Sequence, residues 1–292
     1  MNRLYSVLQI SKQAFHDRLN TYLRKQEELE QLLPLLRDIR QDHPKMSSRH
    51  LYLMVRPQTI GRDKFEAFCF ERGLKVQVKR CFKRTTNSLG VTRFENHLLN
   101  LELTHVNQVW VSDITYYGIS NRFYYLTFIM DLYSRTIVGY SVSENLFTEN
   151  TTLKALKMAL RVRKGCNLKG LIIHSDGGGQ YYSKEFLAIT KDMVNSMCES
   201  VYENIHAERI NGTIKNQYLE GYQPANFEEL KKMSEKAVNM YNRYKPHQSL
   251  CGLSPVGFES LDLGLSTEIT LINKRKKEAK KEKLQQQQLT YS

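Results

Sequence analysis

The chain has 292 residues, of which 41% are hydrophobic, so it can form one large domain or two ordinary ones, each with a proper core. Its 43 lysines and arginines outnumber its 30 aspartates and glutamates, and the formal charge of +13 indicates a polyanionic partner, with nucleic acid as the leading candidate. We find no signal peptide and no apolar run long enough to span a bilayer, which excludes a membrane protein.

The cysteines indicate a reducing compartment. No two of them form a Cys-x-x-Cys pair and their number is odd, so neither a disulfide framework nor a Cys-rich zinc site is expected. We expect reduced, mostly buried thiols in a cytoplasmic protein. The five are Cys69, Cys81, Cys166, Cys198 and Cys251.

The first part of the chain is predicted to be helical. A helix is expected over residues 11–40, with Pro34 breaking or kinking it, and a short helix follows at 47–55. A third helix begins near residue 62 and ends at Gly73, a helix-stop glycine. Two short helices with a tight connection and basic residues on the second are typical of a helix-turn-helix-like module. A plain helical bundle is nearly as compatible with the pattern.

A strongly basic segment follows these helices. Residues 72–93 contain seven cations and no acid, together with threonine, asparagine and serine, which suit phosphate contacts. A solvated linker is the alternative, but the charge of the whole chain favours a linker that follows DNA. The candidate DNA contacts here are Arg72, Lys79, Arg80, Lys83 and Arg84.

From residue 107 the pattern changes to alternating helices and strands. Three strands on short connections predict an antiparallel meander, and two later strands alternate with helices. The order β-β-β-α-β-α-β-α predicts an α/β fold with a mixed sheet and helices packed on it. The expected strands are 109–117, 123–131, 136–142, 171–175 and 195–198, and the expected helices are 152–162, 183–193, 205–219 and 227–244.

Two aspartates of this region are candidate site residues. Asp113 lies in the middle of an apolar strand, where a carboxylate is costly unless it is paired, hydrogen-bonded or bound to a metal. Asp176 follows the strand 171–175 and precedes three glycines. In a sheet ordered 3-2-1-4 the two acids lie side by side, and a divalent cation would relieve their repulsion. In the alternative interpretation Asp176 only caps a helix that begins near Ser183.

Glu208 is the third candidate. At 3.6 residues per turn, Ala207, Ile210, Ile214 and Tyr218 form an apolar stripe that can pack on the sheet. The opposite face presents Glu208, Asn211, Gly212 and Lys215, so it offers a carboxylate to a metal and an ammonium group to a phosphate. In the alternative interpretation these residues are only the solvent-exposed face of an ordinary helix. Together the three acids form an RNase H-like, two-metal pattern, and oxygen ligands favour Mg²⁺ or Mn²⁺.

The chain resembles the integrase-core transposases of bacterial insertion sequences, the OrfB-type products related to retroviral integrases. The resemblance rests on several separate motifs that occur in the same order as in that family. The resemblance covers roughly residues 5–258, and residues 28–85 are similar to the helical amino-terminal part of that family. The matching stretches are residues 107–116, 131–135, 137–140, 174–176 with Gly178, Gln180 and Tyr181, 196–197, 208–218, and Tyr244, Pro246, His247 and 250–255.

The resemblance implies a fold, an activity and partners. The fold is an RNase H-like five-stranded sheet, and the catalytic and metal-binding residues are Asp113, Asp176 and Glu208, which hold two Mg²⁺ or Mn²⁺ ions. The activity is cleavage at the element ends followed by transfer of the 3′-hydroxyl into target DNA. Gln180, Asn211 and Lys215 join the predicted DNA contacts. The implied partners are terminal inverted repeats, target DNA, further copies of the chain on DNA, and an upstream-frame helix-turn-helix protein or fusion.

The chain departs from the family pattern at three places. Gly177 stands where arginine is usual, Glu203 replaces an aspartate, and the thirty-one residues 177–207 are fewer than the family usually has between its second aspartate and its glutamate. The retroviral zinc motif is also absent. A catalytically inactive DNA-binding regulator of transposition and a nuclease on the same fold therefore stay open as alternatives.

The predicted organisation has three parts. Residues 1–97 form a helical DNA-binding region and basic linker, and residues 98–262 form the RNase H-like catalytic core. Residues 263–292 form a basic, glutamine-rich tail that is expected to be disordered. We expect the protein in the bacterial cytoplasm, associated with the nucleoid when it is bound to DNA.

Overall fold

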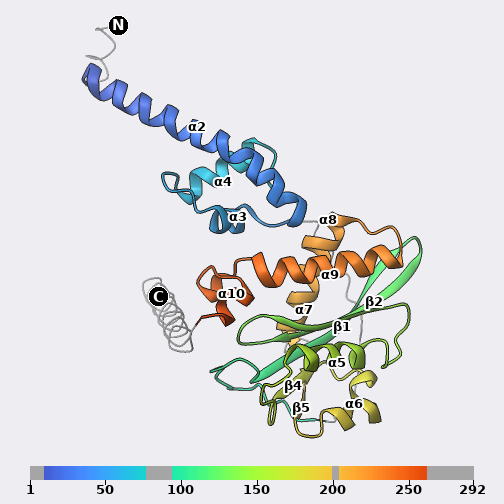
Figure 1. Cartoon of the computed structure of the whole chain (residues 1–292). Coiled ribbons are helices and arrows are strands. Elements are labelled where there is room, and N and C mark those ends of the chain that lie inside the picture. The colour runs from blue at the N-terminus through green and yellow to red at the C-terminus, as the bar shows by residue number, and fades with distance from the viewer. Residues whose placement is uncertain (1–9, 77–93, 199–203, 262–292) are drawn as a thin grey trace, which may run out of the picture. The chain divides into compact units, whose positions relative to one another are not determined.

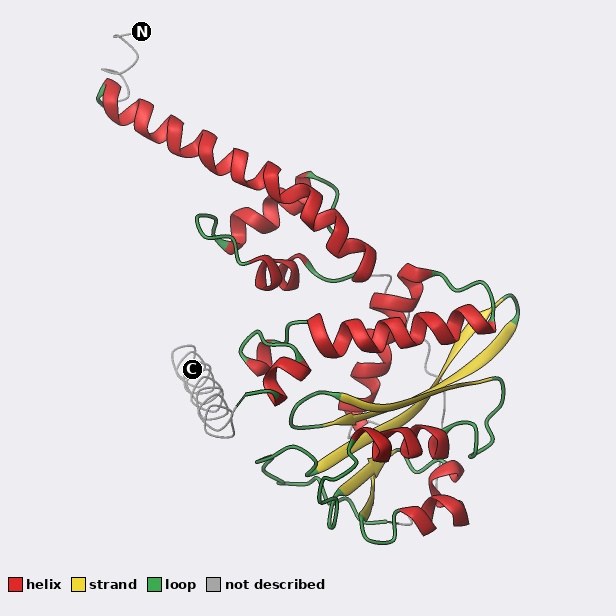
Figure 2. Ribbon diagram, viewed as in Figure 1, coloured by secondary structure: helices red, strands yellow, loops and turns green. Residues whose placement is uncertain are grey.

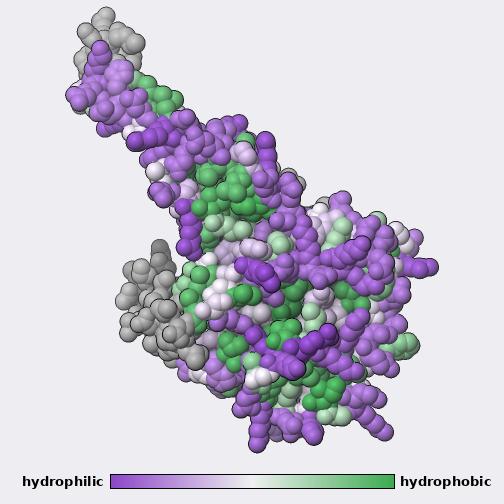
Figure 3. Space-filling view, viewed as in Figure 1, coloured by the Kyte–Doolittle hydropathy of each residue, from purple (hydrophilic) through white to green (hydrophobic). Residues whose placement is uncertain are grey.

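The computed structural model describes residues 10–76, 94–198 and 204–261, and the chain divides into two compact units, residues 1–80 and 81–292. The first unit contains α2 (Lys12–Asp42), α3 (Ser48–Val55) and α4 (Arg62–Glu71) (Figure 1). Its core joins Leu36 of α2 to Leu51 of α3 and Phe65 of α4, all fully buried. On the face of this unit that Figure 3 shows, hydrophobic residues gather over α3 and α4, and the rest of the unit is mostly hydrophilic.

Two details of this unit test the sequence predictions. α2 continues through Pro34 as one helix of 31 residues, so of the two predicted effects of Pro34, a break or a kink, the break is wrong. Proline removes one backbone donor, and the burial of Leu29 and Leu36 on either side of it stabilises the continuous helix. Gly73 has a φ of 70° directly after α4, which confirms it as the helix-stop glycine.

The second unit is built on a mixed five-stranded sheet of order β3-β2-β1-β4-β5. The first three strands are antiparallel to one another, and β1, β4 and β5 are parallel. The predicted RNase H-like fold class and the strand order 3-2-1-4 are therefore confirmed. The strands are β1 (Val109–Ile119), β2 (Arg122–Asp131), β3 (Ile137–Ser143), β4 (Ile172–Ser175) and β5 (Val194–Met197).

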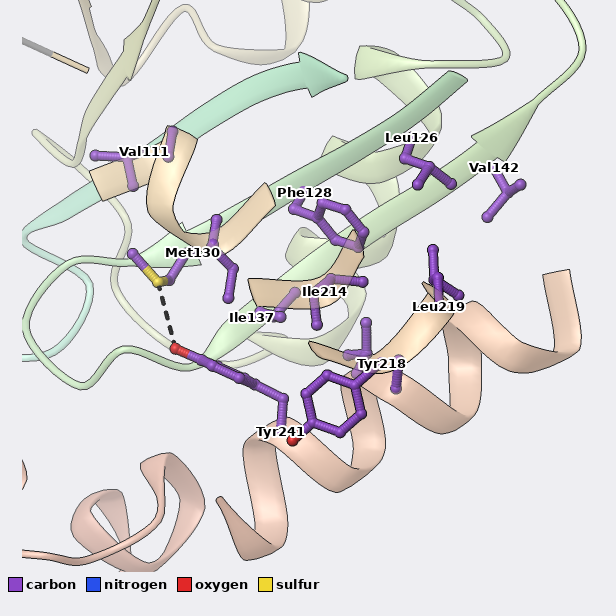
Figure 4. Close-up of a cluster of buried hydrophobic side chains, with 14 of the residues drawn as sticks. Val111, Leu126, Phe128, Met130, Ile137, Val142, Ile214, Tyr218, Leu219 and Tyr241 are labelled. Carbon is purple, nitrogen blue, oxygen red and sulfur yellow. Dashed lines mark hydrogen bonds between the residues drawn. The ribbon is translucent and has the colours of Figure 1, made fainter. Parts of the chain in front are cut away.

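Helices cover both faces of the sheet (Figure 2). On one face Val111 and Phe128 pack against Ile214 and Tyr218 in a core that also contains Tyr241 (Figure 4). On the other face Trp110 packs with Leu156 and Phe186. The helices are α5 (Thr152–Val162), α6 (Lys184–Ile189), α7 (Ile205–Gly212), α8 (Glu220–Tyr222), α9 (Phe227–Tyr244) and α10 (Pro255–Glu259), with 3₁₀ turns at Gly179–Tyr182 and Gln248–Leu250.

The helix predicted over residues 205–219 changes its winding. α7 is α-helical to Gly212, and Thr213–Leu219 continues as a π-helix. The predicted apolar stripe is nonetheless confirmed, because Ala207, Ile210, Ile214 and Tyr218 are all buried. The wider π turns keep Ile214 and Tyr218 on the sheet. Helix α6 ends at Ile189 and is shorter than predicted.

The described cysteines form no disulfide, but only half of them are buried. Cys69 and Cys198 are buried, whereas Cys166 and Cys251 are exposed, so the expectation of mostly buried thiols is only partly correct. No helix within the described residues is long and apolar enough to cross a membrane. The predicted boundaries at residues 97 and 262 stay predictions, and the carboxyl-terminal tail lies outside the described residues.

Gly139 lets α5 approach β3 closely. A Cβ atom at this position would lie 2.2 Å from the carbonyl oxygen of Ala155 and 2.9 Å from the Cβ of Ala159. We expect Gly139→Ala to lower the free energy of unfolding by about 2 kcal/mol, because the helix must move away from the sheet. Urea denaturation measures this change. Gly179→Ala is the control, since a Cβ there meets no atom within 4 Å, and equal midpoints for the two variants would contradict the prediction.

Candidate active site

The sheet register places two acids beside each other. In the parallel pair of β1 and β4, Val111 is the partner of His174. Asp113 and Asp176 each lie two residues further along, where β4 has just ended at Ser175. Because residues two apart lie on the same side of a strand, Asp113 faces the side of the sheet that Val111 shares with α7. A buried strand and a strand end thus present two carboxylates at one edge.

Among the carboxyl groups of the site, that of Asp113 has the most strongly shifted pKa. Its pKa is raised to about 8, first by burial and then by the negative charge of Asp176, with a further contribution from Glu208. Hydrogen bonds from the backbone of Ile114 and from the side chain of Asn211 act in the opposite direction. The three predicted acids are therefore close enough to interact electrostatically, and their mutual repulsion favours a bound proton or cation.

Asn211 connects α7 to Asp113. Its Nδ2 donates to Asp113 Oδ2 over 2.7 Å, and the side chain is only 5% exposed. Its Oδ1 is also buried and has no hydrogen-bond partner among the described protein atoms. Glu208 lies in the first turn of the same helix and is exposed. The contact of Asn211 thus fixes the helix that carries Glu208 over the sheet edge.

Asp176 does not cap the helix that follows it. Ser183 performs that task, because its Oγ accepts from the backbone N–H of Phe186. Asp176 instead accepts from the N–H of Gly178 over 3.2 Å and stays exposed at the end of β4. Although the side chain reaches solvent, nearby protein atoms displace part of its water, and this desolvation raises the pKa of Asp176. The capping interpretation is therefore wrong, and the carboxylate is available to a ligand.

A buried tyrosine holds the glycine-containing loop on the sheet. Tyr181 is 3% exposed, and its hydroxyl lies 2.8 Å from the Oγ of Ser112. Its pKa is raised by burial, and the charges of Asp176 and Asp113 add to that effect. Ser112 was not among the predicted site residues, although its place next to Asp113 in an apolar strand was a signal for it. The pair positions the loop that leads away from Asp176.

Two predicted DNA contacts lie near the acids. Lys215 Nζ donates to Thr115 Oγ1 over 3.1 Å and stands 4.9 Å from the ring centre of Tyr116. Burial lowers its pKa, and the charge of Asp113 is among the influences that raise it. Gln180 Nε2 donates to the carbonyl oxygen of Leu146 over 3.3 Å. The predicted DNA contacts of Lys215, Gln180 and Asn211 stay predictions.

The remaining predicted DNA contacts belong to the basic segment. Arg72 ends α4, forms an ion pair with Glu30, and lies 5.5 Å from the ring centre of Phe68. These contacts lie within the first unit. The other four, Lys79, Arg80, Lys83 and Arg84, lie outside the described residues.

Comparison with known proteins identifies the family. Models of the integrase core domain match residues 104–196 and 193–255. An uncharacterized 31 kDa protein of insertion element IS600 from Shigella sonnei is 35% identical over 206 residues, 68% of this chain and 75% of that protein. The transposase InsF of insertion sequence IS3A from Escherichia coli is 30% identical over 199 residues, 66% of this chain and 68% of InsF. This chain belongs to the insertion-sequence transposases with an integrase core.

The two integrase-core models divide the candidate site of this transposase-family chain between them. The first covers Asp113 and Asp176, and the second covers Glu208 and Asn211. Among solved structures, the catalytic core domain of HTLV-2 integrase in complex with magnesium superposes with a TM-score of 0.43 at 24% identity, over 51% of this chain and 94% of that one.

The donor set fits a hard divalent cation. Asp113 and Asp176 supply carboxylate oxygens at adjacent positions, and the buried Oδ1 of Asn211 has no partner within the described part of the chain. Within the residues that the structure describes, no three His, Cys, Asp or Glu side chains are close enough to hold an ion together. Glu208 is exposed on the first turn of α7, and its charge reaches Asp113, whose pKa it helps to raise.

A second long-range contact positions α7 and was not predicted. Arg135 adopts a φ of 65° in the turn between β2 and β3, and its Nη1 lies 3.0 Å from Nδ1 of His206. An arginine only donates, so His206 accepts at this nitrogen. His206 precedes Glu208 by two residues, and Arg135 therefore stabilises the first turn of the helix that carries the third acid. The sequence marked Arg135 only as part of a family motif.

Proposed function

We propose that this chain is a DDE-type polynucleotidyl transferase that cuts the ends of its element and joins the 3′-hydroxyl to target DNA. The observation that supports this best is the parallel register of β1 and β4, which puts Asp113 beside Asp176, with α7 anchored to Asp113 through Asn211. The exposed Glu208 on that helix is the third carboxylate of the proposed set. Simple folding stability gives no reason to collect these charges.

Asp113, Asp176 and Glu208 would hold two Mg²⁺ or Mn²⁺ ions. Such ions, when bound, activate an attacking hydroxyl or water and stabilise negative charge on the phosphate. Asn211 orients the Asp113 carboxylate by donating to Oδ2. The Lys215 ammonium, held by Thr115 at the same edge, offers a positive charge to a phosphate of the DNA end.

DNA is the proposed substrate on both sides of the reaction. The formal charge of +13 supports binding to terminal repeats and to target DNA, with the segment 72–93 as a further contact. Because two element ends must be joined to one target, we propose that several copies of the chain assemble on DNA. An upstream-frame helix-turn-helix protein, separate or fused, is proposed as a further partner.

A strand-transfer assay tests the proposal. The purified chain is incubated with labelled duplexes of the terminal repeats and a supercoiled target plasmid, in Mg²⁺ or in EDTA. We expect ends joined to the plasmid in Mg²⁺ only. Cleavage that is never followed by joining would indicate a nuclease on this fold. Salt-sensitive binding without metal-dependent cleavage would indicate an inactive regulator.

Asn211 gives a specific prediction for this activity. Asn211→Ala removes the donor to Asp113 Oδ2, and we expect the rate of strand transfer to fall roughly 10- to 100-fold, as is typical when a partner that orients a metal ligand is lost. Initial rates at saturating Mg²⁺ measure the effect. Asn216→Ala, at an exposed position further along the helix, is the control. Equal rates for the two variants would argue against an orienting role for Asn211.

A further inference from the structure

The loop 144–151 between β3 and α5 holds an aromatic side chain out in solvent. Phe147 is 65% exposed, the highest value for a large hydrophobic side chain among the described residues. Its backbone is nevertheless fixed on both sides. The N–H of Phe147 donates to Asn145 Oδ1 over 3.2 Å, and its carbonyl oxygen accepts from the N–H and the Oγ1 of Thr151 over 3.1 and 2.8 Å. The ring is therefore presented on a rigid support.

This support is continuous with the candidate active site. Gln180 Nε2 donates to the carbonyl oxygen of Leu146, and Thr152 Oγ1 donates to the carbonyl oxygen of Gln180, both over 3.3 Å. These bonds tie Leu146 within the loop, and Thr152 directly after it, to the segment that follows Asp176. Leu146 is also exposed, at 43%, so two neighbouring apolar side chains stand beside the loop that carries the second carboxylate.

The charge of the loop decides what kind of DNA group it contacts. Residues 144–151 contain Glu144 and Glu149 and no lysine or arginine, although the chain as a whole is strongly basic. Acidic side chains repel phosphates, so this loop is unsuited to follow the DNA backbone. Aromatic rings stack on unpaired bases, and apolar side chains insert between base steps. A nucleobase is therefore the part of DNA that this loop suits.

We propose that Phe147 stacks on an unpaired nucleobase of the element end, next to the phosphate that is cut. This inference rests on the proposed function, because it needs a DNA end at the three acids. Leu146 fills the gap beside the displaced base. The fixed backbone of the loop lowers the entropic cost of binding, since the main chain that carries the ring is already ordered before the DNA arrives.

A fluorescent base reports this contact without catalysis. The full chain is titrated in EDTA with an element-end duplex that carries 2-aminopurine next to the cut position. We expect the wild type to quench the emission by stacking, and Phe147→Ala to leave it bright and to weaken end binding at least about tenfold. Phe147→Tyr retains the ring and is expected to quench as the wild type does. Phe123→Ala is the matched control, since Phe123 is 61% exposed in the same unit.

Two results would overturn the inference. One is equal quenching by the wild type and Phe147→Ala. The other is a change in the sedimentation coefficient of DNA-free Phe147→Ala, which would show that the ring lies in a contact between copies of the chain. The proposed function fails separately: a wild type that quenches through Phe147 but never joins ends leaves the base contact standing. A wild type that joins ends without Phe147-dependent quenching refutes only the base contact.

Discussion

Asp113→Asn is expected to abolish Mg²⁺-dependent cleavage and joining of element ends, with a loss of roughly a thousandfold or more in rate. In the proposed mechanism the Asp113 carboxylate would hold a cation beside Asp176, and asparagine lacks the negative charge to do so; a catalytic metal contributes several kcal/mol to stabilising the transition state. Asp176→Asn and Glu208→Gln are expected to have effects of the same size. Rates of end cleavage and of strand transfer, measured with the same labelled duplex, test all three variants.

The control for these substitutions is Asp192→Asn. Asp192 is exposed just before β5, outside the candidate site, and should retain full activity when its charge is removed. Binding of the element-end duplex should persist in the three site variants, because none of the substitutions adds a negative charge that repels phosphate. An Asp113→Asn protein that still joined ends to target DNA would contradict the catalytic assignment.

The three acids should also fail as a unit. If they hold one metal assembly, Asp113→Asn combined with Glu208→Gln should be scarcely slower than either single variant, since each alone already removes the assembly. Multiplicative losses would instead indicate three independent contributions. The same assay distinguishes the two outcomes, because the cleavage rate of the double variant is compared with the residual rates of the two single variants.

The sequence was most informative where local pattern and sheet topology agreed. The β-branched and aromatic residues on either side of Asp113 placed it in a strand, and the strand order 3-2-1-4 brought it beside Asp176. The helical period likewise separated the buried stripe of α7 from Glu208. These predictions needed only residue spacing and short connections, which is why they agree with the structure.

Contacts between distant segments were beyond the reach of the sequence. The bond from Asn211 to Asp113 joins residues 98 positions apart, and the contact of Arg135 with His206 spans 71. Both depend on how α7 lies on the sheet, which no local pattern encodes. The π-helix Thr213–Leu219 and the continuous helix through Pro34 have the same origin, because packing against neighbours outweighs local preference.

One departure from the family pattern has a structural reason. Gly177, where the family usually has arginine, adopts a φ of 78°, a conformation that glycine adopts without strain. A Cβ there would also lie 2.3 Å from the terminal carbon of the Met197 side chain. The glycine therefore permits the tight turn in which Gly178 donates to Asp176. An arginine at this position would adopt a strained φ and would displace the end of the Met197 side chain.

The metal-free chain is expected to lose stability as the pH rises from about 4 to about 8. Asp113 has a pKa of about 8 in the folded chain, against an ordinary value of 3.8. Between these values the folded chain keeps a proton that the unfolded chain has released, so the folded state binds more protons and stability falls with increasing pH. The raised pKa of Asp176 acts in the same direction. We expect a decrease of about 3 kcal/mol in the free energy of unfolding between pH 5 and pH 8.

Urea denaturation in EDTA at pH 5, 6, 7 and 8 measures this decrease. Asp113→Asn removes the titrating group, so its pH dependence should be much flatter and it should exceed the wild type in stability at pH 8. Lys245, whose pKa burial lowers to about 8, changes the pH dependence of stability mainly above that pH, where the unfolded chain still binds the proton that the folded chain has lost. Asp192→Asn should keep the slope of the wild type, and parallel slopes for Asp113→Asn and the wild type would contradict the prediction.

Added Mg²⁺ should reverse the loss at pH 8. A cation that binds only the folded chain stabilises it by mass action, and its positive charge lowers the pKa of the Asp113 carboxylate. The midpoint of the wild type at pH 8 should therefore rise with Mg²⁺, whereas that of Asp113→Asn should change little. The burial of Asp113, together with the repulsion from Asp176, would then favour metal binding, because both effects make the metal-free carboxylate costly to the fold. A rise in stability with Mg²⁺ that requires Asp113 would therefore identify this carboxylate as a metal ligand.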